Sequence, residues 1–196
     1  MIRRIAIGLL VVLGVACAPS TMPTSMPLDP ELVGVASELC PIMWRWQLAV
    51  GQILNDMSSA SYEESDAAAR RSLYTAAFDQ VRSANSTLRH EISGLSPGPY
   101  VDLLAEEIVN GIAGADSVID EIENTVAASY SATPPPTYHE MVPTIFMSME
   151  KVIDIAKPEL AGYANDDLIA AFISVPQCQH GVKDANDGIP RYVPLQ

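Results

Sequence analysis

The chain has 196 residues, of which 24 are acidic and 11 are basic, so its formal net charge is −13. Such a charge argues against nucleic acid binding and against electrostatic attraction to an anionic lipid surface. Apolar residues make up 48% of the chain, which is enough for one domain with a hydrophobic core.

The first 17 residues have the order of an export signal. Arg3 and Arg4 precede a run of apolar residues that ends in small ones, as in a secretory signal peptide. The run is shorter than the roughly 20 residues that a membrane-spanning helix needs. We therefore predict that residues 1–16 are a signal peptide. The surrounding pattern of a twin-arginine signal is missing, so the general secretory route is expected.

Val15-Ala16-Cys17 resembles the lipobox of bacterial lipoproteins, in which a signal peptidase cuts just before a cysteine that carries diacylglycerol. The resemblance covers only the first 17 residues, and Gly14 stands where the lipobox usually has Leu or another branched residue. It implies a lipid on Cys17 that anchors the protein to the cell membrane on its extracytoplasmic side. The alternative is ordinary cleavage after Ala18, which would give a secreted protein.

Residues 17–30 are expected to be a proline-rich tether. The segment contains four prolines among Ser, Thr and Met and has no basic residue: Pro19, Pro23, Pro27 and Pro30. This composition favours an extended chain at about 3.1 Å per residue, which could hold a domain some 40 Å from a membrane. A tail without a spacing role fits the same composition.

With Cys17 assigned to the lipid, Cys40 and Cys178 remain. In an oxidising compartment a disulfide between them is the default expectation. A metal site or a reactive thiol is the alternative. The bridge would tie the first helix to the C-terminal segment, and the chain-entropy model gives it on the order of 4–5 kcal/mol as an upper figure.

Residues 31–196 are predicted to form a single helical domain with an irregular C-terminal tail. A first helix is expected from Pro30, capped by Asp29 and kinked or restarted at Pro41. A capping box of Ser61 and Glu64 should start the second helix, and Gly94 should end it.

The third helix is expected to follow Pro99 and to end before the break at residues 132–137. A fourth should stop before Pro158, and a short fifth should span 166–174. The spacing of apolar residues indicates four main amphipathic helices, and no pair of strands is evident. Short connections imply antiparallel neighbours, so the predicted fold is an all-α bundle of four main helices with a short fifth, closed by one disulfide.

Gly94-Leu95-Ser96-Pro97-Gly98 has the letters of the G-x-S-x-G hydrolase motif. That motif needs a strand before the serine and a backbone N–H directly after it. A helix is expected before this segment, and Pro97 has no N–H. We interpret it as a turn between helices.

Candidate metal ligands are few. His90, His139 and His180 lack the spacing of zinc or di-iron motifs, and the segment 184–188 departs from a calcium loop. His139 with Met141, Met147 and Met149 could hold Cu(I), but Met149 falls on an apolar stripe and is expected in the core. No metal and no cofactor is predicted.

Trp44 and Trp46 cannot both face the core, because adjacent helical positions point about 100° apart. Trp46 lies on the apolar stripe and is expected to be buried. Trp44 either packs near Pro41 or is an exposed contact for a partner or ligand. The glycosylation sequon Asn85-Ser86-Thr87 is expected to have no role.

These features favour a non-enzymatic lipoprotein that binds an envelope protein or a small ligand. The alternative is a carrier of a small apolar ligand or a metal within the bundle. A third hypothesis is a helical enzyme that uses scattered charges, and its candidate residues are Arg45, Arg82, Arg89, Glu64 and Glu107.

Overall fold

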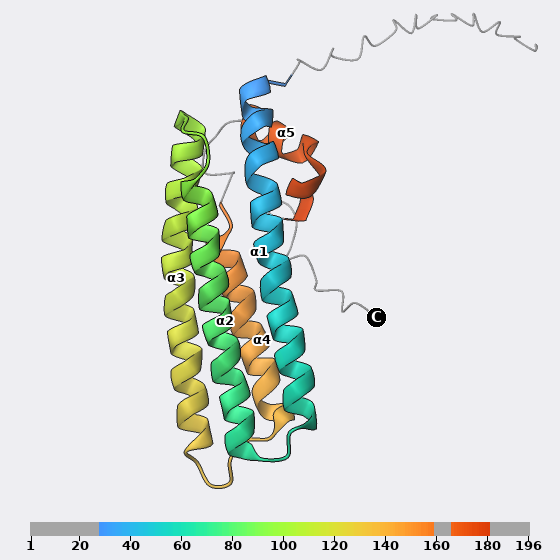
Figure 1. Cartoon of the computed structure of the whole chain (residues 1–196), viewed down its shortest axis with the longest axis vertical. Coiled ribbons are helices and arrows are strands. Elements are labelled where there is room, and N and C mark those ends of the chain that lie inside the picture. Colours follow the sequence, from blue (N-terminus) through green and yellow to red (C-terminus); the bar gives the residue numbers. More distant parts are fainter. Residues whose placement is uncertain (1–27, 159–165, 181–196) are drawn as a thin grey trace, which may run out of the picture.

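The computed structural model describes residues 28–158 and 166–180, where all the regular secondary structure is helical. The helices are α1 (Pro30–Glu63), α2 (Ala67–Ser93), α3 (Pro99–Tyr130), α4 (Tyr138–Ala156), α5 (Asp166–Ser174) and the short 3-10 helix η2 (Pro176–His180). The first four run side by side, each antiparallel to the one before it (Figure 1). The predicted all-α bundle with a short fifth helix is confirmed.

Several sequence predictions fall outside these ranges. The signal peptide, the lipidated Cys17 and the tether up to residue 27 lie outside the described residues, and so does the segment 184–188.

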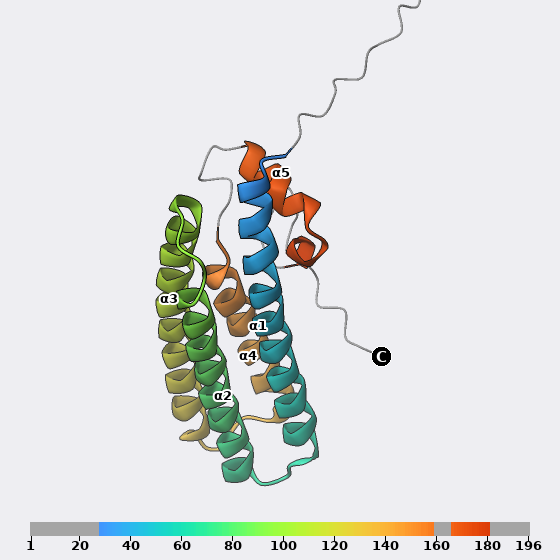
Figure 2. The same cartoon turned by 45° about the horizontal axis from the view of Figure 1, so that its top comes forward.

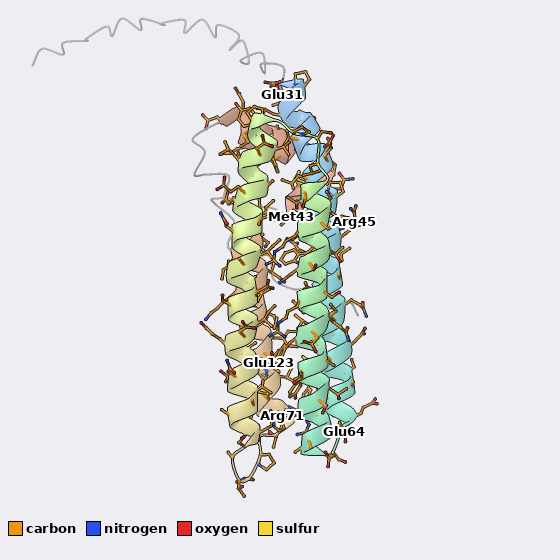
Figure 3. All side chains as sticks on the ribbon, turned by 60° about the vertical axis from the view of Figure 1, so that its left-hand side comes forward. Glu31, Met43, Arg45, Glu64, Arg71 and Glu123 are labelled. Carbon is orange, nitrogen blue, oxygen red and sulfur yellow. A yellow bond between two sulfur atoms is a disulfide. The ribbon has the colours of Figure 1, made fainter. Side chains whose placement is uncertain are left out.

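Helix α1 spans the full length of the bundle, with Glu31 near one end and Glu64 just past the other (Figure 3). Asp29 caps its start as predicted, because the Asp29 carboxylate accepts a hydrogen bond of 2.9 Å from the backbone N–H of Glu31. The helix continues through Pro41, so the predicted restart does not occur. Buried residues on both sides of Pro41, including Leu39 and Met43, hold the two halves against the same core.

The turn between α1 and α2 differs from the prediction. Ser61 does not cap α2 but lies buried within α1, where its hydroxyl donates to the carbonyl oxygen of Ser58 at 3.1 Å. The N-cap of α2 is Asp66, whose carboxylate accepts from the backbone N–H of Ala69 at 2.8 Å. Packing explains the difference. The buried face of α1 extends to Met57 and Ser61, so α1 continues past Ser61 and ends at Glu63.

The connection between α2 and α3 is a short turn. Gly94 is the C-cap of α2, as predicted, and Gly98 is the N-cap of α3. Ser96 therefore lies between two helices, which confirms that the G-x-S-x-G letters mark a turn.

Helices α3 and α4 approach each other very closely at Gly111. A Cβ atom placed on Gly111 would lie 2.3 Å from the carbonyl oxygen of Ile155, and one on Gly114 would lie 3.0 Å from the Ile155 side chain. Only glycine lets the two backbones meet here. Helix α4 ends at Ala156, before Pro158, as predicted.

Helix α5 and η2 pack against the N-terminal half of α1 and against each other (Figure 2). Leu168 and Phe172 of α5 are buried in this contact. The Cys40–Cys178 disulfide joins α1 to η2 with a Cα–Cα distance of 4.8 Å. The predicted disulfide is confirmed.

Candidate functional site

The two tryptophans occupy different environments. Trp46 is only 4% exposed, which confirms its predicted place in the core. Trp44 is half-buried, so the choice between a packing residue and a partner contact stays open. The other candidate sites lie among the polar residues between the helices and at one end of the bundle.

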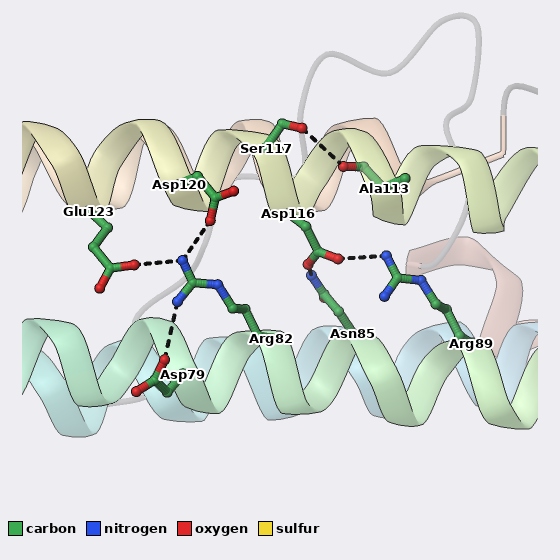
Figure 4. A network of polar contacts seen from close by, with 9 residues as sticks. All are labelled: Asp79, Arg82, Asn85, Arg89, Ala113, Asp116, Ser117, Asp120 and Glu123. Atoms are coloured by element: carbon green, nitrogen blue, oxygen red, sulfur yellow. Dashed lines mark hydrogen bonds and ion pairs between the residues drawn. The ribbon is translucent and has the colours of Figure 1, made fainter.

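A row of polar contacts joins α2 to α3 (Figure 4). Arg82, Asn85 and Arg89 follow one face of α2 at spacings of three and four residues. Their partners on α3 are Asp116, Asp120 and Glu123. These spacings place each set on one helix face, so the two helices meet along a charged seam.

Arg82 is the most heavily paired residue of the seam. Its guanidinium lies 2.6 Å from the Glu123 carboxylate, 2.8 Å from Asp120 and 3.1 Å from Asp79. The hydrogen bond to Glu123 is the main reason that the pKa of Arg82 is raised above its ordinary value. The positive charge is thus shared among three acids and is not presented to a ligand.

Asn85 is the member of the seam that lies in the core, and its side chain is fully buried. Its side-chain oxygen accepts from the Trp46 indole N–H at 2.9 Å, and its amide donates to the Asp116 carboxylate at 2.8 Å. Asp116 also accepts from Arg89. Three helices are therefore linked through one amide. A buried Asn85 is closed to modification in the folded protein, although it begins a glycosylation sequon.

The charged residues of the enzyme hypothesis do not gather in one place. Arg45 pairs with Glu91 at 3.2 Å, while Arg82 and Arg89 bind acids of α3. The Glu64 carboxylate instead accepts from the backbone N–H of Asp66. Arg45, Arg82 and Arg89 thus form ion pairs with Glu91 and with the acids of the seam, and these pairs join neighbouring helices.

The residues considered for Cu(I) are also divided. Met141 and Met149 are 5% and 0% exposed, whereas Met147 is 60% exposed and His139 lies at the surface. Met149 is thus a core residue, as its apolar stripe predicted. Within the described ranges, no three His, Cys, Asp or Glu side chains are placed to hold a metal ion.

An aromatic cluster lies where α1 ends and α4 begins. It consists of Tyr62, Tyr138 and His139, which we call the end patch. The Tyr62 and Tyr138 ring centroids are 5.3 Å apart, and those of Tyr138 and His139 are 5.1 Å apart. Tyr62 is 67% exposed, the highest value among the large apolar side chains described. The end patch is therefore an ordered aromatic surface open to solvent.

Local structure positions the end patch, and most directly the Tyr138 ring. Thr137 and Glu140 form a capping box that starts α4, which sets Tyr138 and His139 in its first turn. The backbone and side chain of Thr137 both bond to the Glu140 carboxylate and lower its pKa. The Tyr138 hydroxyl lies 2.9 Å from the Ser58 hydroxyl of α1. The patch is thus held by both helices.

Arg70 joins the two connections at this end of the bundle. Its guanidinium donates to the carbonyl oxygen of Glu64 at 2.7 Å and to that of Pro136 at 3.3 Å. The first belongs to the α1–α2 turn and the second to the α3–α4 loop. This single side chain holds together the two segments beside the end patch.

A second aromatic pair involves the core. Tyr74 is fully buried, and its ring lies 6.1 Å from that of Tyr130 with the planes at 66°. Both hydroxyls are buried, and the side chains of Ser61 and Tyr130 lie close enough to the Tyr74 hydroxyl to act on its pKa. Burial raises the pKa of Tyr74 to about 12.

Sequence reasoning missed both the polar network and the end patch. Asn85 could have been found, because it stands four residues after Val81 and three before Leu88, on the buried face of α2. The pattern Thr137-x-x-Glu140 also signals a capping box. Nothing in the sequence alone places Tyr62 beside Tyr138, which are 76 positions apart.

Comparisons with known proteins give no relative from which to infer a role: the chain matches no family model, no curated protein and no solved structure. Among the helices described, none combines the length and the apolar character needed to span a membrane.

Proposed function

We propose that this protein is a membrane-anchored extracytoplasmic binding module of the bacterial cell envelope, without enzymatic activity, that holds a protein partner at the end patch. The observation that carries this proposal is the exposure of Tyr62. A tyrosine that is 67% exposed, and whose ring is already positioned by two neighbours, is suited to bury its surface against another protein. Tyrosine is among the residues that contribute most to binding at interfaces.

The position of the end patch supports the same role. Helix α1 has 34 residues, so at about 1.5 Å per residue its two ends are roughly 50 Å apart. The tether would join at the Pro30 end, and the end patch lies at the other. An anchor at Cys17 would thus leave the end patch at the far end of the bundle, where a partner can reach it.

The energetics also favour a preorganised surface. An aromatic side chain buries about 150–250 Å² when it is covered. The capping box of α4 and the contact of Ser58 with Tyr138 fix the backbone and rings beforehand. Less conformational freedom is then lost on binding, and more of the contact energy remains as affinity.

Site-directed photo-crosslinking tests the surface. A photoreactive residue would replace Tyr62 in one variant and Leu103 in another. Leu103 is the matched control, since it is 51% exposed and lies near the start of α3, at the opposite end of the bundle. We expect a discrete adduct with native membranes from position 62 and none from position 103.

The adduct must then be identified and its affinity measured. Tyr62→Ser should weaken binding of the purified partner by about tenfold or more, the effect of a residue that dominates an interface. Leu103→Ser should leave it unchanged. Equal adducts at both positions, or equal affinity of the two variants, would rule out the end patch as the docking surface.

The anchor requires a separate measurement. Denaturing mass spectrometry of the protein taken from its own membranes should give residues 17–196 plus a diacylglyceryl group. A chain that begins at Pro19 would show a plain secreted protein and overturn the anchor. A small molecule retained under native conditions would instead favour the carrier hypothesis.

A further inference from the structure

The planes of the three rings of the end patch lie at steep angles to one another. The planes of Tyr62 and Tyr138 meet at 78°, those of Tyr138 and His139 at 83°, and those of Tyr62 and His139 at 73°. Every pair is therefore close to perpendicular. The centroids are 5.1 to 6.4 Å apart, so the rings pack edge to face, and Tyr62, which is 67% exposed, offers most of the free ring surface.

Four helix termini meet at this end of the bundle, and most of the side chains that cap them are acidic. Helices α1 and α3 end here, and neither has a basic residue in its last turn. Helices α2 and α4 begin here, and the carboxylates of Asp66 and Glu140 lie at their N-termini. The positive ends of the dipoles of α2 and α4 are thus offset by acids. The negative end of α1 meets the Arg70 guanidinium, which binds the carbonyl oxygen of Glu64, the C-cap of α1, whereas α3 has no base in its last turn.

The charged side chains at this end of the bundle also favour a cation over an anion. The acids around the two turns are Glu63, Glu64, Asp66 and Glu140, and the bases are Arg70, Arg71 and the His139 imidazole of the patch itself. Figure 3 shows Glu64 and Arg71 at this end of the bundle. The Arg70 guanidinium is already used by two backbone carbonyls. A cation is therefore attracted to the end patch, whereas an anion would face the larger number of acids.

The geometry points to recognition of a cationic side chain, a lysine or an arginine of the partner protein, against the tyrosine rings of the end patch. The faces of aromatic rings carry negative charge density and attract a cation within about 6 Å of the centroid. This inference rests on the proposed function, because it names the chemistry of the partner that the same surface binds. It adds that the partner presents a basic residue there.

A pair of isosteric probes tests the charge directly. N-acetyl-arginine amide would be titrated into the disulfide-intact protein with ¹³C-labelled tyrosines, and N-acetyl-citrulline amide, which has nearly the same shape without the charge, would be the control. We expect the ring signals of Tyr62 and Tyr138 to shift with the arginine probe. The citrulline probe should bind about two- to fivefold more weakly, the discrimination that an exposed cation–π contact gives.

Two variants distinguish a cation–π contact from non-specific apolar binding. Tyr62→Phe keeps the aromatic face and should retain the preference for arginine over citrulline. Tyr62→Leu keeps an apolar surface without that face and should lose the preference. Since Tyr62 is largely exposed, both variants should fold, and unchanged thermal unfolding would verify this.

Equal shifts with the two probes, or an arginine preference that survives Tyr62→Leu, would overturn the inference. These results are distinct from failure of the proposed function. A crosslink at position 62 without any arginine preference would leave the docking surface standing and reject its cationic partner. An arginine preference without a crosslink at position 62 would leave recognition of a cation standing and reject the docking surface for a protein partner.

Discussion

Asn85 shows how one polar residue can fix the arrangement of three helices. Its amide is buried and has both of its polar atoms engaged, one by Trp46 of α1 and one by Asp116 of α3. An apolar contact could slide along a helix, but this pair of hydrogen bonds fits only one register. Buried polar groups that are fully satisfied are known to favour a single arrangement over its alternatives.

Substitution of Asn85 by Leu should destabilise the protein by about 1–3 kcal/mol. The change leaves the Trp46 indole N–H without its acceptor inside the core and removes one partner of Asp116. Urea unfolding followed by helical circular dichroism measures the loss. Asn55→Leu is the control, because Asn55 is exposed on α1 and should change stability by less than about 0.5 kcal/mol. A variant as stable as the parent would show that the network contributes nothing net.

Tyr74 gives a prediction for alkaline pH. Burial raises its pKa from 10.0 to about 12 in the folded protein, so the fold favours the neutral phenol. The corresponding stability is fully present below pH 10 and is lost as pH rises through about 12, because the unfolded chain ionises first. The loss is on the order of 2 kcal/mol.

Tyr74→Phe isolates this effect from the other tyrosines. Phenylalanine keeps the buried ring and removes a hydroxyl that is not well hydrogen-bonded in the core, so we expect the variant to have nearly the stability of the parent at neutral pH. Between about pH 10 and 12 the parent should lose stability faster than the variant. The free energy of unfolding of both proteins would be measured across this pH range. An equal loss in parent and variant would reject Tyr74 ionisation as the cause.

At the scale of the helices, the periodic spacing of apolar residues predicts the secondary structure. Contacts between residues on different helices are not predicted, because they depend on how the helices align. Helix type and number follow from apolar spacing, and α5 begins and ends where expected. The predicted start of α2 is wrong because the Ser61–Glu64 pattern is a local signal, whereas packing keeps Ser61 inside α1 and leaves Asp66 to cap α2. The pairing of Tyr62 with Tyr138 depends on how α1 and α4 align, which no local pattern records.

The α3–α4 contact yields a prediction about Gly111. A methyl group at Gly111 would lie 2.3 Å from a backbone oxygen of α4, so one helix has to shift. Overpacking of this kind costs about 1–3 kcal/mol, and alanine's better helix propensity returns up to about 1 kcal/mol. Gly111→Ala should thus lower stability by about 1–2 kcal/mol.

Gly34 of α1 provides the matched control, because a Cβ there would meet nothing within 4 Å. Gly34→Ala should therefore raise stability by about 0.5–1 kcal/mol. Thermal and urea unfolding of the two variants should give changes of opposite sign. If both variants gain stability, the close approach of α3 and α4 at Gly111 is wrong.

For the molecule as a whole, the disulfide decides whether the C-terminal elements belong to the fold. Helices α1 to α4 bury their apolar faces against one another, whereas α5 and η2 pack on α1 alone among the four long helices. The bridge between Cys40 and Cys178 joins residues 138 positions apart. The longer the loop that a crosslink closes, the more conformational freedom it removes from the unfolded chain.

Replacing both cysteines by alanine should therefore have a global and a local effect. Global stability should fall by several kcal/mol, with about 4–5 kcal/mol as the upper figure for such a loop. Hydrogen exchange should accelerate first in α5 and η2, because α5 is then held to α1 only by packing of residues such as Leu168 and Phe172. The amides at the centres of α2 and α3 should keep exchange protection limited only by global unfolding. Uniform acceleration along the chain would mean instead that α5 and the bundle unfold as one unit, and that the bridge secures the whole fold and not its last two elements.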